Sequence, residues 1–308
     1  MEYIILLIAL FAIVCGANYL VDGSVSIAKR FGVSDFIVGA VIVGIGTSMP
    51  ELVVSFTGAL KGNPDVAIGN VVGSNIFNVL GILGLTAMFA PVAVDRKNLC
   101  FEIPYCIAVS ILLTFLASDG ISHLDGIVLL VCFVIFLWFS IGRGKSAPTI
   151  ERPSDMVHIA LWIPIAKVMV GLFVLITGSN FFVDSAVQIA QSLGVGDAFI
   201  SLTLIACGTS LPELAASVTA ALKKNTQMAI GNIVGSNVFN ITGILGLSSL
   251  VIPLTASGVT SVDYIVMTMA SVLLLIFGFR GGISRIGGVF MFICFLAYNG
   301  YLFKNQIV

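Results

Sequence analysis

Long apolar runs alternate with short polar stretches along the whole chain. Ten of these runs approach the length of roughly 20 apolar residues that a helix needs to cross a bilayer. We place them near residues 3–21, 36–60, 65–90, 101–118, 124–141, 159–182, 198–222, 227–252, 262–279 and 286–303. The pattern predicts an all-α polytopic membrane protein with ten transmembrane helices.

The only hydrophilic stretch of any length lies in the middle of the chain. Residues 142–158 read GRGKSAPTIERPSDMVH and have the Pro, Gly and charge content of a linker. They separate a five-helix unit in residues 1–141 from a second five-helix unit in residues 159–308. Because five is odd, the second unit should enter the membrane upside down, as in the inverted repeats of secondary transporters.

The two halves are copies of one another. Residues 46–85 and 208–247 align without a gap at an offset of 162, and 27 of the 40 positions are identical. The same offset relates Asp22 to Asp184, which we interpret as residues at the membrane interface. Polar residues that recur inside apolar surroundings are the first candidates for function.

Composition and charge narrow the class of protein. Hydrophobic residues make up 58% of the 308 residues and charged residues only 9%, which excludes a soluble domain. A net charge of −1 gives no reason to expect a nucleic-acid partner. The six scattered cysteines are interpreted as small apolar core residues. Glu2 stands where a signal peptide would be basic, so we expect no cleavable signal.

Basic residues predict how the helices are oriented. The positive-inside rule places the more basic side in the cytoplasm, so the linker should be cytoplasmic and both termini outside. The basic side carries eleven residues: Lys29, Arg30, Arg96, Lys97, Arg143, Lys145, Arg152, Lys223, Lys224, Arg280 and Arg285. The opposite side carries Lys61 and Lys304.

Glu51 and Glu213 lie well inside their predicted helices at matched positions. An ionised carboxylate at the bilayer centre costs about 2.5–3.5 kcal/mol on insertion scales. Two facing carboxylates repel unless one is protonated or a cation lies between them. We interpret the pair as a cation site, with a neutral glutamic acid that joins two helices as the alternative.

Hydroxyl groups precede each glutamate on the same helix face. Thr47 and Ser48 lie four and three residues before Glu51, and the second copy repeats this with Thr209 and Ser210. A proline directly before each glutamate should break the helix and free backbone carbonyls, which are ready cation ligands.

A polar stripe at helical spacing follows in each copy. Carboxylate, hydroxyl, amide and carbonyl oxygens together form an all-oxygen set, which suits a hard cation such as Ca²⁺. The stripe comprises Asn70, Ser74 and Asn78 in the first copy and Asn232, Ser236 and Asn240 in the second, with Asn75 and Asn237 beside them.

The repeated blocks G-T-S-x-P-E and G-N-x-V-G-S-N-x-F-N resemble the two α-repeats of the sodium/calcium exchangers, in the calcium/cation antiporter superfamily. The resemblance to the prokaryotic type covers nearly the whole chain. It implies exchange of Na⁺ for Ca²⁺ by alternating access, with the first and sixth helices sliding past the rest. It implies Ca²⁺ ligands at Glu51, Glu213 and the carbonyls of Thr47 and Thr209. It implies Na⁺ sites that draw on Ser48, Ser210, Ser74, Ser236 and the backbone near Gly44 and Ala206, with Asn78 and Asn240 completing the cluster.

Two departures from relatives refine this expectation. Some relatives, including the potassium-dependent branch, carry Asp where this chain has Asn240, which argues against K⁺ co-transport. The proton-coupled branch usually reads Asn-Ala-x-Glu in the first block, whereas this chain reads Thr-Ser-Met-Pro-Glu.

The linker is too short for the large Ca²⁺-binding regulatory domains of animal exchangers.

Two other transport functions remain open at this point: an antiporter coupled to H⁺ or carrying another divalent cation, and a passive cation channel. We expect no enzyme, because the chain has no GxSG or HExxH block of an intramembrane protease. We expect no cofactor, with Ca²⁺, Na⁺ and the lipid bilayer as partners, and a protein that functions as a monomer in the cell membrane.

Overall fold

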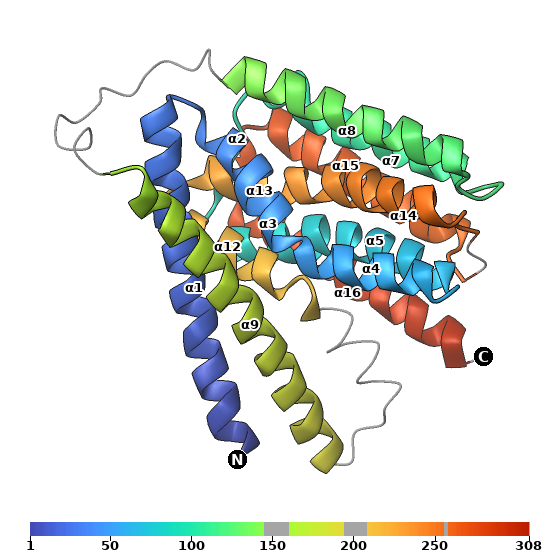
Figure 1. Cartoon of the computed structure of the whole chain (residues 1–308), viewed down its shortest axis with the longest axis horizontal. Helices are drawn as coiled ribbons and strands as arrows, with labels where there is room; N and C mark the ends of the chain where they lie inside the picture. The colour runs from blue at the N-terminus through green and yellow to red at the C-terminus, as the bar shows by residue number, and fades with distance from the viewer. Residues whose placement is uncertain (145–159, 194–207, 256–257, 308) are drawn as a thin grey trace.

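A computed structural model describes residues 1–144, 160–193, 208–255 and 258–307. Helices make up the regular structure of this part of the chain, apart from two strands of two residues each (Figure 1). The first half contains α1 (Glu2–Phe31), α2 (Asp35–Val38), η1 (Gly39–Gly44), α3 (Ile45–Thr47), α4 (Met49–Leu60), α5 (Pro64–Ile76), η2 (Phe77–Leu83), α6 (Gly84–Phe89), β1 (Val92–Ala93), α7 (Glu102–Leu116) and α8 (His123–Gly144). The second half contains α9 (Trp162–Ser192), α12 (Leu211–Leu222), α13 (Thr226–Val238), η5 (Phe239–Ile244), α14 (Leu245–Val251), α15 (Ser261–Phe279), β2 (Gly282–Ile283) and α16 (Arg285–Ile307). The segments η1, η2 and η5 are π-helical.

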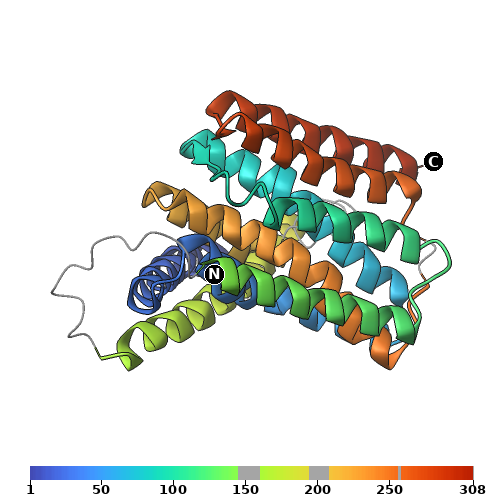
Figure 2. The same ribbon diagram turned by 90° about the horizontal axis from the view of Figure 1, so that it is seen from above.

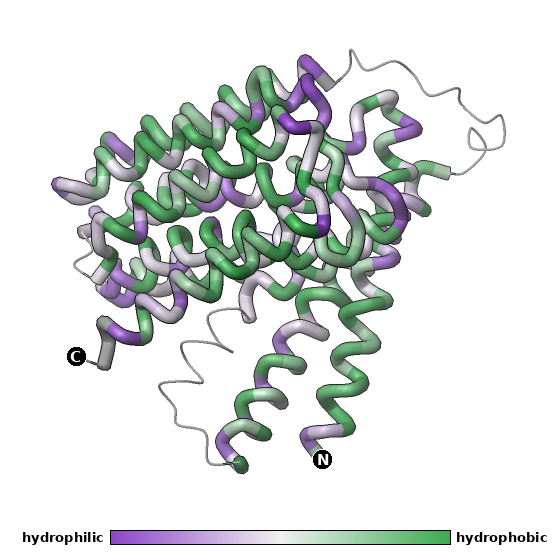
Figure 3. Tube along the Cα trace, turned by 180° about the vertical axis from the view of Figure 1, so that it is seen from behind, coloured by the Kyte–Doolittle hydropathy of each residue, from purple (hydrophilic) through white to green (hydrophobic). Residues whose placement is uncertain are grey.

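Within the described ranges, seven helices are long and apolar enough to cross a membrane, and a bent pair makes up to eight. Two shorter apolar helices, α7 and α12, lie in the fourth and seventh predicted runs, and residues 198–207 of the seventh run are outside the described part. The long helices are hydrophobic along most of their length (Figure 3). The prediction of an all-helical membrane protein is confirmed, and the count of ten stays a prediction.

Helices α4 and α12 each begin directly after the serine that lies two residues before the Pro-Glu pair. In the first copy, the helical segments 35–47 and 49–60 meet at a bend of 47°. Ser48 at this break has φ −83° and ψ 10°, and Ser210 before α12 has nearly the same values, φ −92° and ψ 9°. Because proline has no N–H and crowds the preceding turn, the chain resumes as a helix with proline in its first turn.

Helices α1 and α9 are longer than their apolar runs. We predicted ends near residues 21 and 182, but the helices continue to Phe31 and Ser192, so these two boundaries were wrong. Hydropathy marks where the apolar run stops, whereas α1 ends where Gly32 adopts a left-handed conformation with φ 63°. The two helices lie side by side and antiparallel, apart from the main stack of helices (Figures 1 and 2).

The short strands connect the two halves in both directions. Val92 of β1 pairs with Ile283 of β2, and Ile121 forms an isolated antiparallel bridge with Leu254. Adding 162 to Val92 gives Leu254, and adding 162 to Ile121 gives Ile283. The same pairing therefore occurs twice with the roles of the halves exchanged, so the duplicated sequence folds with internal two-fold symmetry at these contacts.

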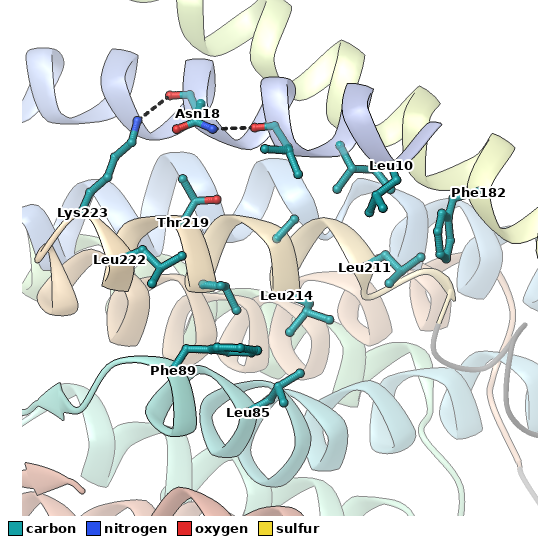
Figure 4. Close-up of a pocket in the computed structure, with 14 residues that line it drawn as sticks. Leu10, Asn18, Leu85, Phe89, Phe182, Leu211, Leu214, Thr219, Leu222 and Lys223 are labelled. Carbon is teal, nitrogen blue, oxygen red and sulfur yellow. Dashed lines mark hydrogen bonds between the residues drawn. The ribbon is translucent and has the colours of Figure 1, made fainter. Parts of the chain in front are cut away.

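An apolar cavity lies between parts of the α1–α9 pair and the helices α6 and α12. Its volume is about 400 Å³, and side chains from all four helices line it. Leu10, Phe182, Leu211 and Leu214 are among its apolar walls, whereas Lys223 stands near Asn18 at one end (Figure 4). The pair is thus less tightly packed against α12 than a closed interior would be.

Candidate cation-binding site

Glu51 and Glu213 lie in the first turns of α4 and α12, shortly after Ser48 and Ser210. Their exposed fractions are 1% and 0%. The described residues include two ion pairs, Lys223 with Asp22 and Arg143 with Glu102, and neither involves these glutamates. The site therefore buries two carboxylates without a basic partner, which costs free energy unless another cation compensates them.

Each glutamate is held by a serine from the other half of the chain. The Ser48 hydroxyl donates to Glu213 Oε1 at 2.8 Å, and the Ser210 hydroxyl donates to Glu51 Oε1 at 2.9 Å. The second carboxylate oxygen, Oε2, has no hydrogen-bond partner in either glutamate. The serines fix the carboxylates across the interface between the halves and leave one oxygen of each available.

Further buried oxygens without a hydrogen-bond partner belong to the same residue set. They are Asn78 Oδ1, Asn240 Oδ1 and Thr209 Oγ1. A buried polar atom left without a partner costs about 1–3 kcal/mol, and native proteins keep such atoms rare. Single atoms of this kind occur elsewhere, such as the Ser140 hydroxyl, but this set combines two carboxylates with two amides.

Ser236 and Thr47 meet at the carbonyl of Gly44. The Ser236 hydroxyl donates to Gly44 O at 3.1 Å, and the Thr47 hydroxyl lies 3.3 Å from both Gly44 O and Asn232 Oδ1. A Cβ on Gly44 would lie only 2.8 Å from Asn232 O, so the close approach of η1 to α13 requires glycine here. Ala206, the predicted counterpart of Gly44, lies outside the described residues.

The predicted polar stripe divides into two functions. Ser74 lies 3.4 Å from the Ser210 hydroxyl and so joins the cluster. Asn70 instead braces the broken helix, because its Nδ2 donates to the Ser55 hydroxyl at 2.9 Å and to Glu51 O at 3.3 Å.

The second copy repeats this brace. Asn232 Nδ2 donates to the Ser217 hydroxyl at 2.9 Å and to Glu213 O at 3.2 Å. We did not single out Ser55 and Ser217 in the sequence, although both lie four residues after a site glutamate and are identical at the offset of 162. Their repetition was the signal that would have identified them.

The donor chemistry fits a hard cation. The described residues contain no cluster of three or more His, Cys, Asp or Glu side chains, so the charge of the site comes from two glutamates. Carboxylate, amide and hydroxyl oxygens are the ligands that Ca²⁺ prefers, and two carboxylates match its charge. Hydrogen bonds connect Ser48, Ser210 and Ser74 with the two glutamates. Asn78 and Asn240 bond Asn237 and Asn75 instead, and Ala206 lies outside the described residues.

The profile of the family described as "Sodium/calcium exchanger protein" matches residues 1–142 and 163–304. The chain belongs to the sodium/calcium exchanger family. The match to both halves confirms the family that the two blocks indicate. The chain is therefore a transmembrane protein of a cation/Ca²⁺ antiporter family.

Individual relatives match this chain over nearly its full length. The sodium/calcium exchanger MaX1 of Methanosarcina acetivorans is 31% identical over 347 residues, covering 98% of each chain. An uncharacterized membrane protein of Methanocaldococcus jannaschii, MJ0091, is 36% identical over 283 residues, covering 92% of each. The solved structure of the sodium-calcium exchanger NCX_Mj, soaked with zero Na⁺ and Ca²⁺, superposes with a TM-score of 0.87 at 32% identity, covering 98% of each chain.

Replacing a serine that crosses between the halves should weaken cation binding. In Ser210→Ala, Glu51 Oε1 loses the hydroxyl donor that lies at 2.9 Å, and the carboxylate is free to turn. A hydrogen bond to a charged group is worth about 1.5–3 kcal/mol, so we expect the apparent affinity for Ca²⁺ to fall about 10-fold or more. Ca²⁺-concentration dependence of uptake measures this, and Ser192→Ala, whose hydroxyl bonds its own helix at Ile189 O, is the control.

Proposed function

We propose that the protein is a secondary active antiporter that exchanges Na⁺ for Ca²⁺ and extrudes Ca²⁺ with the inward Na⁺ gradient. The observation that carries this proposal is the reciprocal pair of serine–glutamate bonds, each of which leaves one carboxylate oxygen without a partner. The family and the names of the relatives support the same ions.

Electrostatics explains why such a site exchanges ions. The two glutamates supply a charge that one Ca²⁺ neutralises, and Na⁺ ions compete for the same oxygens. Binding both kinds at once would leave excess positive charge in a medium where charge is costly. One ion must therefore leave before the other binds, and only a neutralised site is free to change conformation.

We assign Ca²⁺ to Glu51, Glu213 and the carbonyls of Thr47 and Thr209. Na⁺ sites would use the hydroxyls around them and the backbone near Gly44 and Ala206, with amide oxygens completing the cluster. The hydroxyl and amide members are Ser48, Ser210, Ser74, Ser236, Asn78 and Asn240. The burial of these six side chains supports the assignment, since each of them is at most 4% exposed.

Sliding of α1 and α9 is the proposed change of access. The two helices pack chiefly against each other, and a cavity of about 400 Å³ lies between this pair and the helices α6 and α12 (Figure 4). An apolar cavity of this size has few contacts to break when the pair shifts. This supports a rigid pair that moves past the stationary site.

For the membrane arrangement, we propose ten helices in two inverted five-helix repeats, with both termini outside and the linker in the cytoplasm. The eleven basic residues on one side support this orientation. We propose a monomer as the functional unit, because the glutamates and serines of the site all come from one chain.

Purified protein in liposomes preloaded with Na⁺ should take up Ca²⁺, whereas liposomes preloaded with choline should not. The outward Na⁺ gradient is the only driving force that differs between the two preparations, and the rate should not change when K⁺ is added. Uptake of ⁴⁵Ca²⁺ at fixed pH measures the effect.

Two results would contradict the proposal. Ca²⁺ uptake that follows an imposed pH gradient and ignores Na⁺ would indicate an H⁺-coupled antiporter. Current without any counter-ion would indicate a passive cation channel.

A further inference from the structure

Four buried asparagines, Asn75, Asn78, Asn237 and Asn240, form a hydrogen-bonded relay across the interface between the halves. Asn75 and Asn237, at the ends of α5 and α13, face each other across the interface between the halves. Asn75 Nδ2 donates to Asn237 O, and Asn237 Nδ2 donates to Asn75 O, both at 3.2 Å. Asn78 and Asn240 lie three residues further along, in η2 and η5.

The backbone carbonyls fix the direction of the relay. A carbonyl oxygen only accepts hydrogen bonds, so the side-chain group that faces it must be the NH₂. The amide oxygen of Asn75 must then point the other way, where it accepts from Asn240 Nδ2 at 3.1 Å. In the matched contact, the amide oxygen of Asn237 accepts from Asn78 Nδ2 at 3.0 Å.

The last atoms in the relay are the amide oxygens of Asn78 and Asn240. The NH₂ groups of Asn78 and Asn240 already donate within the relay, whereas their amide oxygens are buried without a hydrogen-bond partner. All four side chains are at most 1% exposed, so water does not compete for the bonds. If either amide turned by 180°, its NH₂ would take the place of the free oxygen.

We propose that Asn75 and Asn237 are positioning residues that turn the amide oxygens of Asn240 and Asn78 toward the transported cation. This rests on the proposed function, because it deepens the description of the same site. A neutral amide presents either a donor or an acceptor, and only the relay selects the acceptor. The pairing crosses the halves, so Asn75 acts through Asn240 and Asn237 acts through Asn78.

The experiment is a double-mutant cycle on ion binding. In Asn75→Ala, we expect the KM for Ca²⁺ to rise about tenfold, because a cation loses one oriented ligand, with little change in the maximal rate. The KM for Ca²⁺ of the double variant Asn75→Ala/Asn240→Ala should be no higher than that of Asn240→Ala alone. The crossed double variant Asn75→Ala/Asn78→Ala should have a higher KM for Ca²⁺ than either single variant. It removes the Asn78 ligand and also the residue that orients the Asn240 ligand.

A second measurement separates orientation from packing. Asn75→Leu fills the space that Asn75→Ala empties, so the two variants should differ in Tm measured in choline. Ca²⁺ or Na⁺ raises the Tm of the purified wild-type protein, and this ion-dependent rise should be smaller by the same amount in both variants. A change of Tm with an unchanged ion-dependent rise and an unchanged KM would overturn the positioning function, as would additive effects of Asn75→Ala and Asn240→Ala.

Measurements on the wild-type protein distinguish a failure of this proposal from a failure of the proposed Na⁺/Ca²⁺ exchange. If wild type shows neither an ion-dependent rise in Tm nor Na⁺-driven uptake, the proposed function fails and the relay fails with it. If wild type shows both and the asparagine variants behave like wild type, only the relay is wrong. Where Asn75→Ala does not yield folded protein, Asn237→Ala with its partner Asn78→Ala provides the matched cycle.

Discussion

Glu51→Gln and Glu213→Gln should each abolish Ca²⁺ uptake while the protein still folds. Gln has the same shape and still accepts a hydrogen bond from the serine of the opposite half, but it removes half of the charge that balances a divalent cation. We expect uptake driven by Na⁺ to fall at least about 100-fold, equivalent to about 2.7 kcal/mol in binding. The measurement is ⁴⁵Ca²⁺ uptake into Na⁺-loaded liposomes.

Glu102→Gln is the matched control for these variants. Glu102 is another buried glutamate, 3% exposed, but it lies at the start of α7 and pairs with Arg143 at 3.8 Å. Its replacement removes a buried carboxylate without touching the cation cluster, so Ca²⁺ uptake should persist. Normal uptake in Glu51→Gln or Glu213→Gln would refute the assignment of the site.

Gly16→Leu should destabilise the protein and stop transport. A Cβ on Gly16 would lie 2.6 Å from Leu175 N and 2.9 Å from Gly171 O, which are backbone atoms of α9. Backbone cannot turn aside as a side chain does, so α1 and α9 must separate. Overpacking of this kind typically costs about 1–3 kcal/mol, and we expect the upper end or more here. Thermal unfolding of the purified protein, together with uptake, measures both effects.

The same substitution at two further glycines should have smaller effects on stability. Gly178, the counterpart of Gly16 at the offset of 162, would place a Cβ 3.2 Å from Ala12 Cβ and Ile13 N, so Gly178→Leu should be milder. Gly300 in α16 has nothing within 4 Å of an added Cβ, and Gly300→Leu should leave Tm unchanged or higher, because glycine is a poor helix former. Equal effects at all three positions would show that the α1–α9 contact is not what matters.

The duplication made much of this protein readable from one sequence. A buried carboxylate that recurs 162 residues later, with the same hydroxyls before it, has few structural explanations in an apolar helix. The proline before each glutamate predicted a broken helix, and the helices that carry the glutamates begin directly after Ser48 in one half and Ser210 in the other. The family was indicated by the same blocks and is confirmed by the match to both halves.

Helix length and hydrogen-bond partners were not readable in this way. Hydropathy ended α1 ten residues early, because an apolar run measures contact with lipid and not the extent of helical backbone. Spacing placed Asn70, Ser74 and Asn78 on one face, yet Asn70 braces α4 while Asn78 belongs to the relay. Periodicity gives the face of a helix and says nothing about what the facing helix presents.

The sequence by itself determined the membrane-embedded helical fold, the two matched copies and the residue types of the proposed all-oxygen cation site. The tertiary structure decided which oxygens of that set are used up and which remain, because the bonds that matter cross between halves about 160 residues apart. Ser48 reaches Glu213 and Asn240 reaches Asn75 only after the two copies pack together. Side-chain identity is local information, whereas the direction of a buried hydrogen bond is set by the neighbour that folding supplies.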